Sequence, residues 1–197
     1  MADQSKNSTS NNEKIRLYLG TACGKSTATF GVLLRAVSSG KNVTLVFFDK
    51  METNSSEGPG LKVLTEAASR EGFGKLTVKY TGVNRIGTGP GGSFRLYSSP
   101  NGILPEDEEA AREGLGHIAE ALKRGDDIVI GDEILDVARV GLVDWKLVEE
   151  TFALRKDPTV LILTGRRAPD WLMKEATTIS TTTQLKHHGK AIAGLDC

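Results

Sequence analysis

Short apolar segments rich in β-branched and aromatic residues recur along the chain. They are near-continuously apolar rather than alternating, which is typical of strands buried on both faces of a sheet. Strands are therefore expected at 15–19, 43–48, 75–80, 127–133 and 159–163, with a candidate edge strand in TISTTTQ, residues 178–184.

Between these segments the apolar residues change to helical spacing. Within residues 25–39, four of them fall on one face of a helix, namely Phe30, Leu33, Leu34 and Val37. Further helices are expected at 61–70, from Pro105 onward, at 144–154 and, in a short form, from Pro169. Strands that alternate with helices predict an α/β fold in which a mostly parallel sheet carries helices on both faces. Right-handed crossovers place the strand-to-helix loops along one edge of such a sheet, where a ligand is expected.

Residues 81–104 interrupt this alternation, since they are rich in glycine and show no sustained period. An irregular segment of that length in a compact domain is more often a functional loop than a connector. The helix that follows opens with PEDEEAAR, where Pro105 suits the first turn and residues 106–109 are acidic. We interpret the acidic run as favourable electrostatics at the positive end of the helix dipole rather than as a metal site.

Composition narrows the function classes. The 197 residues contain 25 Lys+Arg and 25 Asp+Glu, so no global field draws the chain to nucleic acid or to an anionic membrane. No apolar run approaches the ~20 residues that span a bilayer. The two cysteines, Cys23 and Cys197, fit a reducing cytoplasm rather than a disulfide framework. Polar residues 1–14 predict a flexible tail before one domain at 15–197.

The stretch LYLGTACGKST, residues 17–27, is a candidate phosphate-binding loop between the first strand and the first helix. Its Gly-Lys-Ser at 24–26 supplies a lysine to offset phosphate charge and a hydroxyl to reach Mg²⁺. The usual spacing asks for glycine at Leu19, but Gly20 can still make the tight turn. The residues at 21–23 are small enough for close backbone approach. Residues 20–26 are called the phosphate loop below.

Two carboxylates, Asp132 and Glu133, end the apolar strand DIVIGDE. At the carboxyl end of a parallel strand they lie on the ligand edge, so they join the phosphate loop in predicting a nucleotide site with Mg²⁺. The expected fold is a single-domain P-loop (RecA-like) three-layer α/β fold with five or six strands. A glycine-rich turn with a solvated lysine is the simpler alternative, but it leaves the carboxylates unexplained. We interpret Cys23 as a small loop-filling residue, because no resolving thiol is evident.

Four motifs, in order over residues 15–197, resemble those of the ATP:corrinoid adenosyltransferases. YLGTACGKSTATFGVLLRAV is similar to T-G-N-G-K-G-K-T-T-A-A-F-G-x-x-x-R-A, whose first glycine also falls one position late. DIVIGDEIL is similar to D-x-V-V-L-D-E-L, LTGRRAPDWLMKEA to I-T-G-R-x-A-P with a short helix, and KHHGKAIAGLDC to K-H-P…G…A-x-x-G-I-[ED]-[YF]. The resemblance implies transfer of the 5′-deoxyadenosyl group of ATP to the reduced cobalt of a corrinoid, with release of triphosphate.

The resemblance also implies residue roles. The expected nucleotide-binding residues are Gly20, Thr21, Ala22, Cys23, Gly24, Lys25, Ser26, Thr27, Arg35 and Arg166. Lys25, Glu133 and Arg166 are the expected catalytic residues, and Ser26, Asp132 and Glu133 are expected near Mg²⁺. For Arg35, a surface ion pair and a ligand contact remain open. Cobalt(I) is itself a strong nucleophile, so no side-chain nucleophile or general base is expected.

The chain departs from the family at two places. Residues 21–23 replace Asn, Gly and Lys, so one positive charge is missing; at ~4 Å and an effective dielectric of ~20 it would contribute about 4 kcal/mol before desolvation. This predicts weaker ATP binding or another nucleotide preference. The 81–104 loop has GTGPGGSFRLYSSP where the family carries a G-F-T-W-like motif that packs under the corrin. Phe94 and Tyr97 are candidate replacements, whereas Trp145 and Trp171 are expected in core or surface packing.

Lys186, His187 and His188 are not expected to bind metal, because adjacent residues on an extended chain point oppositely. Expected partners are ATP, a corrinoid such as cob(I)alamin or cob(I)yrinic acid a,c-diamide, an electron donor such as a reduced flavoprotein, and a second copy in a homodimer. Two alternative functions remain: another P-loop ATPase or phosphotransferase, and a non-catalytic nucleotide- or corrinoid-binding relative.

Overall fold

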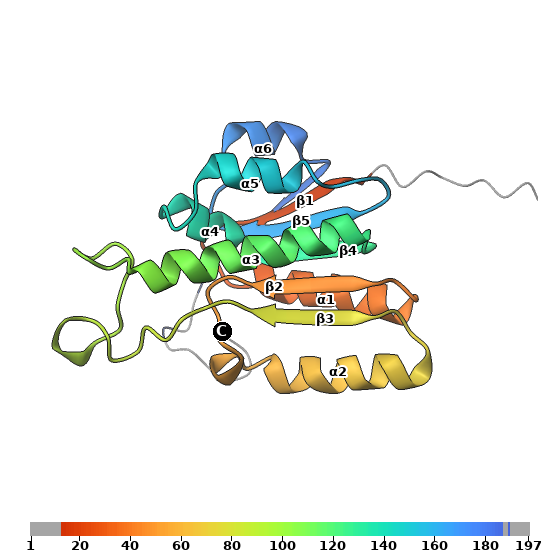
Figure 1. Ribbon diagram of the computed structural model, residues 1–197, viewed down its shortest axis with the longest axis horizontal. Helices are drawn as coiled ribbons and strands as arrows, with labels where there is room; N and C mark the ends of the chain where they lie inside the picture. The colour runs from red at the N-terminus through yellow and green to blue at the C-terminus, as the bar shows by residue number, and fades with distance from the viewer. Residues whose placement is uncertain (1–12, 187–188, 190–197) are drawn as a thin grey trace, which may run out of the picture.

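A sheet of six parallel strands lies at the centre of the computed structural model, which describes residues 13–186 and 189 (Figure 1). The strands are β1 (Ile15–Leu19), β2 (Val43–Phe47), β3 (Leu76–Tyr80), β4 (Ile128–Asp132), β5 (Val160–Gly165) and β6 (Thr178–Thr181). Their order is β3-β2-β4-β5-β1-β6, and every neighbouring pair is parallel. The predicted fold class is therefore confirmed, and the stretch TISTTTQ does supply an edge strand.

Helices cover both faces of the sheet (Figure 1). One face carries α1 (Lys25–Ser38) and α2 (Gly58–Glu71), and the other carries α3 (Pro105–Arg124), α4 (Ile134–Arg139), α5 (Trp145–Phe152) and α6 (Asp170–Glu175). Each face has its own apolar core, since alternate residues of the buried strands point to opposite sides. Leu33, Val37 and Leu61 pack on the first face, and Ile118, Leu135 and Val148 pack on the second.

The carboxyl ends of all strands meet at one edge of the sheet. Strand β5 lies between β1 and β4, with Leu19 opposite Gly165 and Gly131 opposite Leu163. The loop that follows β1 and the carboxylates that follow β4 therefore lie two strands apart, or about 10 Å at the usual strand spacing.

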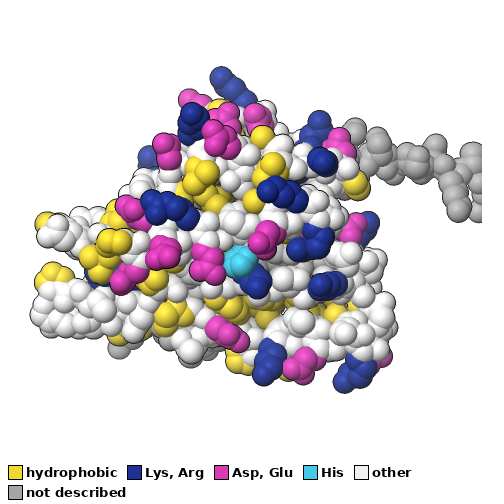
Figure 2. All heavy atoms as spheres, viewed as in Figure 1, with side chains coloured by type: hydrophobic (Ala, Val, Ile, Leu, Met, Phe, Trp, Pro, Cys, Tyr) yellow, Lys and Arg dark blue, Asp and Glu magenta, His cyan; other side chains and the backbone are white. Residues whose placement is uncertain are grey.

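Trp145 and Trp171 pack edge to face, 6.5 Å apart, against the core of the α3 face, as predicted. Acidic and basic side chains are interspersed over the face seen in Figure 2, in line with the balanced composition. Within residues 13–186 and 189, no helix is long and apolar enough to cross a membrane. Residues 1–12 of the predicted tail at 1–14, together with His187, His188 and Cys197, lie outside the described residues.

Candidate functional site

Backbone conformation explains why the first glycine of the phosphate loop comes one position late. Gly20 has a φ of 127° and Gly24 a φ of 105°, values that disfavour any side chain. A Cβ atom on Gly20 would also lie 2.3 Å from the carbonyl oxygen of Thr182, the residue that follows β6. The Thr182 amide in turn donates to the Leu19 carbonyl at 2.8 Å. Glycine is thus required where β6 closes over the turn, one residue after Leu19.

The start of α1 presents backbone donors to the edge of the sheet. Gly24 caps the helix without a side-chain hydrogen bond, and the first turn contains no acidic residue. Amides in such a turn are free to meet an anion, and the helix dipole favours one. The Lys25 ammonium donates to the Ala22 carbonyl at 3.0 Å, which holds its charge over the phosphate loop.

Asp132 is the polar centre behind the phosphate loop. Its side chain is fully buried, and it accepts from Ser26 Oγ at 3.0 Å and from Thr164 Oγ1 at 2.9 Å. The Lys50 ammonium lies 3.6 Å from its Oδ2 atom. The structure thus joins Ser26 and Asp132, which are 106 residues apart and are two of the three residues expected near Mg²⁺.

Glu133 turns the chain from β4 directly into α4. It has a left-handed φ of 65°, and its amide donates to Thr164 Oγ1 at 2.8 Å. Burial raises the pKa of Glu133 to about 7, and the negative charges of Asp132 and Asp49 add to this effect. Near neutral pH its carboxyl group is therefore close to the midpoint of its titration.

A cleft of about 520 Å³ opens beside the phosphate loop. Its walls are formed by the phosphate loop, by Asp49 after β2, by the 81–104 loop, and by the segment from Glu133 into α4 with the residue after β5. The side chains that line it include Thr21, Ala22, Cys23, Lys25, Asp49, Arg85, Phe94, Leu96, Tyr97, Glu133, Asp136, Val137, Val140 and Arg166. Charged groups suited to phosphate thus lie on one side, and exposed apolar groups of the 81–104 loop lie on the other.

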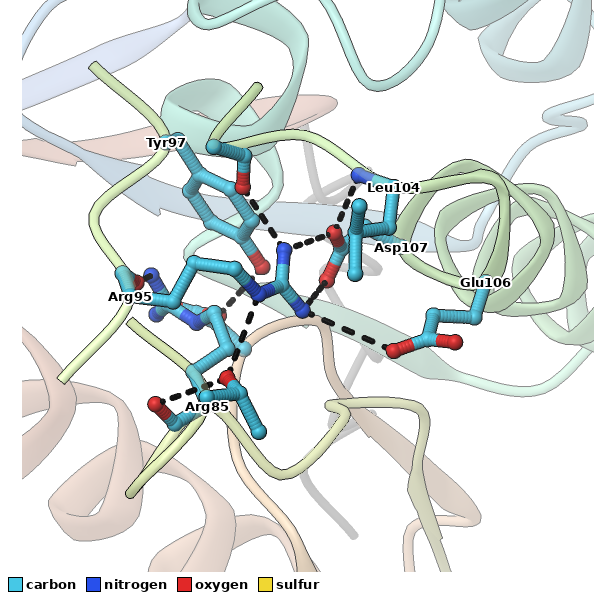
Figure 3. A network of polar contacts seen from close by, with 9 residues as sticks. Arg85, Arg95, Tyr97, Leu104, Glu106 and Asp107 are labelled. Atoms are coloured by element: carbon cyan, nitrogen blue, oxygen red, sulfur yellow. Dashed lines mark hydrogen bonds and ion pairs between the residues drawn. The ribbon is translucent and has the colours of Figure 1, made fainter. Parts of the chain in front are cut away.

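A buried ion pair anchors the 81–104 loop to α3 (Figure 3). The Arg95 guanidinium forms two hydrogen bonds with Asp107, and it also donates to the Gly102 carbonyl at 2.6 Å. Asp107 accepts from the Leu104 amide at 2.8 Å and so caps α3. The prediction that the acidic run serves the helix terminus holds for Asp107, which in addition pairs with Arg95.

A second arginine organises the wall of the cleft. The Arg85 guanidinium stacks on Tyr97, 3.9 Å from the ring centre, and on Phe94 at 4.6 Å. It also pairs with Asp49, which accepts from the Tyr97 hydroxyl at 2.9 Å. Burial raises the pKa of Asp49, although Arg85 and Tyr97 oppose the rise. Tyr97 is thereby held in the wall, whereas 49% of Phe94 and 53% of Leu96 remain exposed.

The structure brings most of the predicted site residues together. Thr21, Ala22, Cys23, Lys25, Glu133 and Arg166 line the cleft, and Ser26 and Asp132 meet behind it. Thr27 is exposed on the first turn of α1. Arg35 lies ten residues beyond Lys25, or about 15 Å along the helix, and its side chain donates to the Gly31 carbonyl. The structure therefore does not bring Arg35 to the cleft.

Sequence reasoning missed Asp49, Lys50 and Arg85. Asp49 and Lys50 follow β2 by two and three residues, so the rule that singled out Asp132 applies to them as well. Arg85 carried no signal of this kind, because it lies in a segment without regular period.

The oxygen ligands around Asp132 fit a magnesium ion that is shared with a substrate. In the described part of the chain no cluster of three or more His, Cys, Asp or Glu residues is arranged to hold a metal. Mg²⁺ commonly uses only one or two carboxylates, with phosphates and water completing its shell. Ser26 Oγ, Asp132 and Glu133 offer such a partial set.

Comparison with known proteins gives two findings. The family model of the ATP:corrinoid adenosyltransferases BtuR/CobO/CobP matches residues 11–195. The chain is also 29% identical, over 187 residues, to the uncharacterized protein all2391 of Nostoc sp. (strain PCC 7120 / SAG 25.82 / UTEX 2576). That match covers 90% of this chain but only 45% of the relative, so the chain spans less than half the length of that protein.

Proposed function

The chain belongs to the ATP:corrinoid adenosyltransferase family, and on this basis we propose that it transfers the 5′-deoxyadenosyl group of ATP to the reduced cobalt of a corrinoid. The observation that carries the proposal is the family match over residues 11–195, nearly the whole chain. The cleft supports it, because a phosphate loop forms one wall and exposed apolar side chains form another. Such a cleft can hold a polyphosphate and a flat apolar ring side by side.

The reaction needs orientation more than side-chain chemistry. An electron pair of cobalt(I) attacks C5′ of ATP, a cobalt–carbon bond forms, and the bond from C5′ to the α-phosphate oxygen breaks. That oxygen leaves with the bonding electrons as part of triphosphate. The protein therefore has two tasks, which are to align C5′ with cobalt and to stabilise the charge on the leaving group.

We assign the leaving-group charge to the phosphate loop and its neighbours. The amides at the start of α1 and the Lys25 ammonium face the place where the triphosphate would lie. Arg166, exposed at the cleft wall, can reach the same phosphates. Ser26, Asp132 and Glu133 would hold Mg²⁺, which neutralises phosphate charge when bound.

On the corrin side, the geometry favours Phe94 over Tyr97. The Tyr97 hydroxyl donates a hydrogen bond to Asp49, and Arg85 covers the Tyr97 ring. About half of the Phe94 surface, by contrast, is exposed at the cleft. An exposed ring of this kind can pack on a tetrapyrrole. We assign the ring contact to Phe94, with Leu96 beside it.

The domain bounds, the acceptor, the electron donor and the working form are proposed from family membership alone. We propose residues 15–197 as the catalytic domain, cob(I)alamin or cob(I)yrinic acid a,c-diamide as the acceptor, and a reduced flavoprotein as the electron donor. A cytoplasmic homodimer is the proposed working form.

An anaerobic assay tests the proposal. Chemically reduced cob(I)alamin and MgATP are mixed with the protein, and the corrinoid spectrum and the phosphorus products are followed together. The expected products are a light-sensitive alkylcobalamin and intact triphosphate. Recovery of ADP and phosphate without alkylcobalamin would instead identify an ATPase.

A further inference from the structure

Lys50 lies next to the phosphate-binding elements but belongs to none of them. It follows β2, and only 17% of its side chain is exposed. Its ammonium is 3.6 Å from Asp132 Oδ2, and the Ser26 hydroxyl is 3.1 Å from the same oxygen. Lys50 therefore shares an oxygen of Asp132 with the hydroxyl that would meet Mg²⁺ and phosphate.

Two carboxylates hold the Lys50 ammonium in place. The Lys50 ammonium forms ion pairs with Asp132 at 3.6 Å and with Glu57 at 3.4 Å. The ammonium also lies 5.2 Å from the centre of the Phe47 ring. A lysine ammonium is thus held at the edge of the sheet where the phosphate loop lies.

The phosphate loop is short of positive charge for a polyphosphate. Among residues 20–26 only Lys25 is cationic, and its ammonium is bonded to the Ala22 carbonyl. A triphosphate carries several negative charges, and more of them develop on it when it leaves. A cation from outside the phosphate loop would therefore have a large effect here.

The contacts of Lys50 leave it able to turn toward such a ligand. Asp132 is already satisfied by the Ser26 and Thr164 hydroxyls, and the 3.6 Å distance from Lys50 is longer than a hydrogen bond. The contact with Glu57, at 3.4 Å, is also long. A lysine ammonium has three donors on a flexible stem, so it can keep one carboxylate and still reach a phosphate oxygen.

We propose that Lys50 is a further polyphosphate-binding residue, which supplies from the end of β2 a positive charge that the phosphate loop lacks. The inference deepens the proposed function, since it rests on triphosphate binding at the phosphate loop. It does not depend on transfer to cobalt.

Calorimetry with magnesium triphosphate tests the inference without any corrinoid. Lys50→Met should weaken binding about tenfold or more, the usual effect of losing one charge-assisted hydrogen bond. Lys50→Arg should recover part of the loss. The control is Lys41→Met, which removes an ion-paired lysine from the opposite end of β2 and should bind as the wild type does. Equal affinity of folded Lys50→Met and wild type overturns the inference.

A measurement on the wild-type protein covers the case in which Lys50→Met does not fold. The Nζ resonances of ¹⁵N-labelled lysines are followed during titration with magnesium triphosphate, and Lys50 is assigned by its absence in Lys50→Arg. The Lys50 and Lys25 signals should move while the Lys41 signal stays. Movement of Lys25 alone overturns the role of Lys50. If no signal moves, triphosphate does not bind, and both this inference and the proposed function fail. If triphosphate binds with the expected effect of Lys50 but the anaerobic assay yields no alkylcobalamin, only the proposed transfer of the adenosyl group to cobalt is overturned.

Discussion

Replacement of Arg95 by methionine should release the 81–104 loop from the body of the protein. Only 4% of the Arg95 side chain is exposed, and the Asp107 side chain is fully buried. Methionine keeps the length and apolar character of the arginine stem but removes the cation. Asp107 would then be a buried carboxylate without the guanidinium of Arg95. It would keep the hydrogen bond from the Leu104 amide.

The expected cost follows from this burial. Removal of one partner of a buried ion pair typically destabilises a protein by about 3–5 kcal/mol, because the other charge is left uncompensated. In a chain of this size that corresponds to a fall in Tm of roughly 6–20 °C if the loop and the sheet unfold together. If the loop detaches first, the global Tm changes less and the loss appears as local opening.

Two measurements separate these outcomes. Thermal unfolding followed by circular dichroism gives the global stability, and amide hydrogen exchange over residues 82–104 gives the local one. Arg112→Met is the matched control, since Arg112 lies on α3 in an exposed pair with Glu108 that should contribute only about 0.2–0.5 kcal/mol. The double variant Arg95→Met with Asp107→Leu should recover most of the loss, less about 1 kcal/mol for the helix cap.

If Arg95→Met unfolds within a degree of Arg112→Met and exchanges no faster over residues 82–104, the buried pair does not hold the loop. Magnesium triphosphate binding should be unchanged in Arg95→Met, because the phosphate loop lies on a different wall of the cleft.

Two further predictions concern the phosphate loop and Glu133. Gly20→Ala should lower the free energy of unfolding by about 1–3 kcal/mol through backbone strain alone, and the contact with Thr182 should lower it further. The variant should also fail to bind magnesium triphosphate in calorimetry. Wild-type stability would contradict the role of the left-handed turn. The pKa of Glu133 is about 7 in the folded chain and 4.5 when unperturbed, so the folded state binds more protons between these values and loses stability as pH rises through them. Glu133→Gln should therefore gain up to about 3 kcal/mol over the wild type at pH 8 and little at pH 4, in urea unfolding without Mg²⁺. A pH-independent difference would contradict this.

The features predicted well from sequence are those with a local physical signal. The buried strands, the phosphate loop and the carboxylates of Asp132 and Glu133 each follow from residue pattern and from position at a strand end. Helix α4 was not predicted, because it has only six residues and no loop separates it from β4. The left-handed Glu133 alone connects the strand to the helix.

The rest of the cleft depends on contacts between distant parts of the chain. Arg85 meets Asp49 across 36 residues, and Arg95 meets Asp107 from within a segment that has no period. No spacing rule predicts these pairs, since the loop conformation that creates them is itself stabilised by them. The same holds for Thr182, whose carbonyl explains the late glycine from 162 positions away.

The central claim is that the cleft presents C5′ of ATP, rather than a phosphorus atom, for attack. ATP labelled with ¹⁸O at the bridge between C5′ and the α-phosphate tests it directly when it is incubated with the protein and cob(I)alamin under anaerobic conditions. The account predicts that the label leaves with intact triphosphate, as shown by its isotope shift in the ³¹P spectrum. Label that stays bonded to the adenosine moiety, in ADP or AMP, would contradict it.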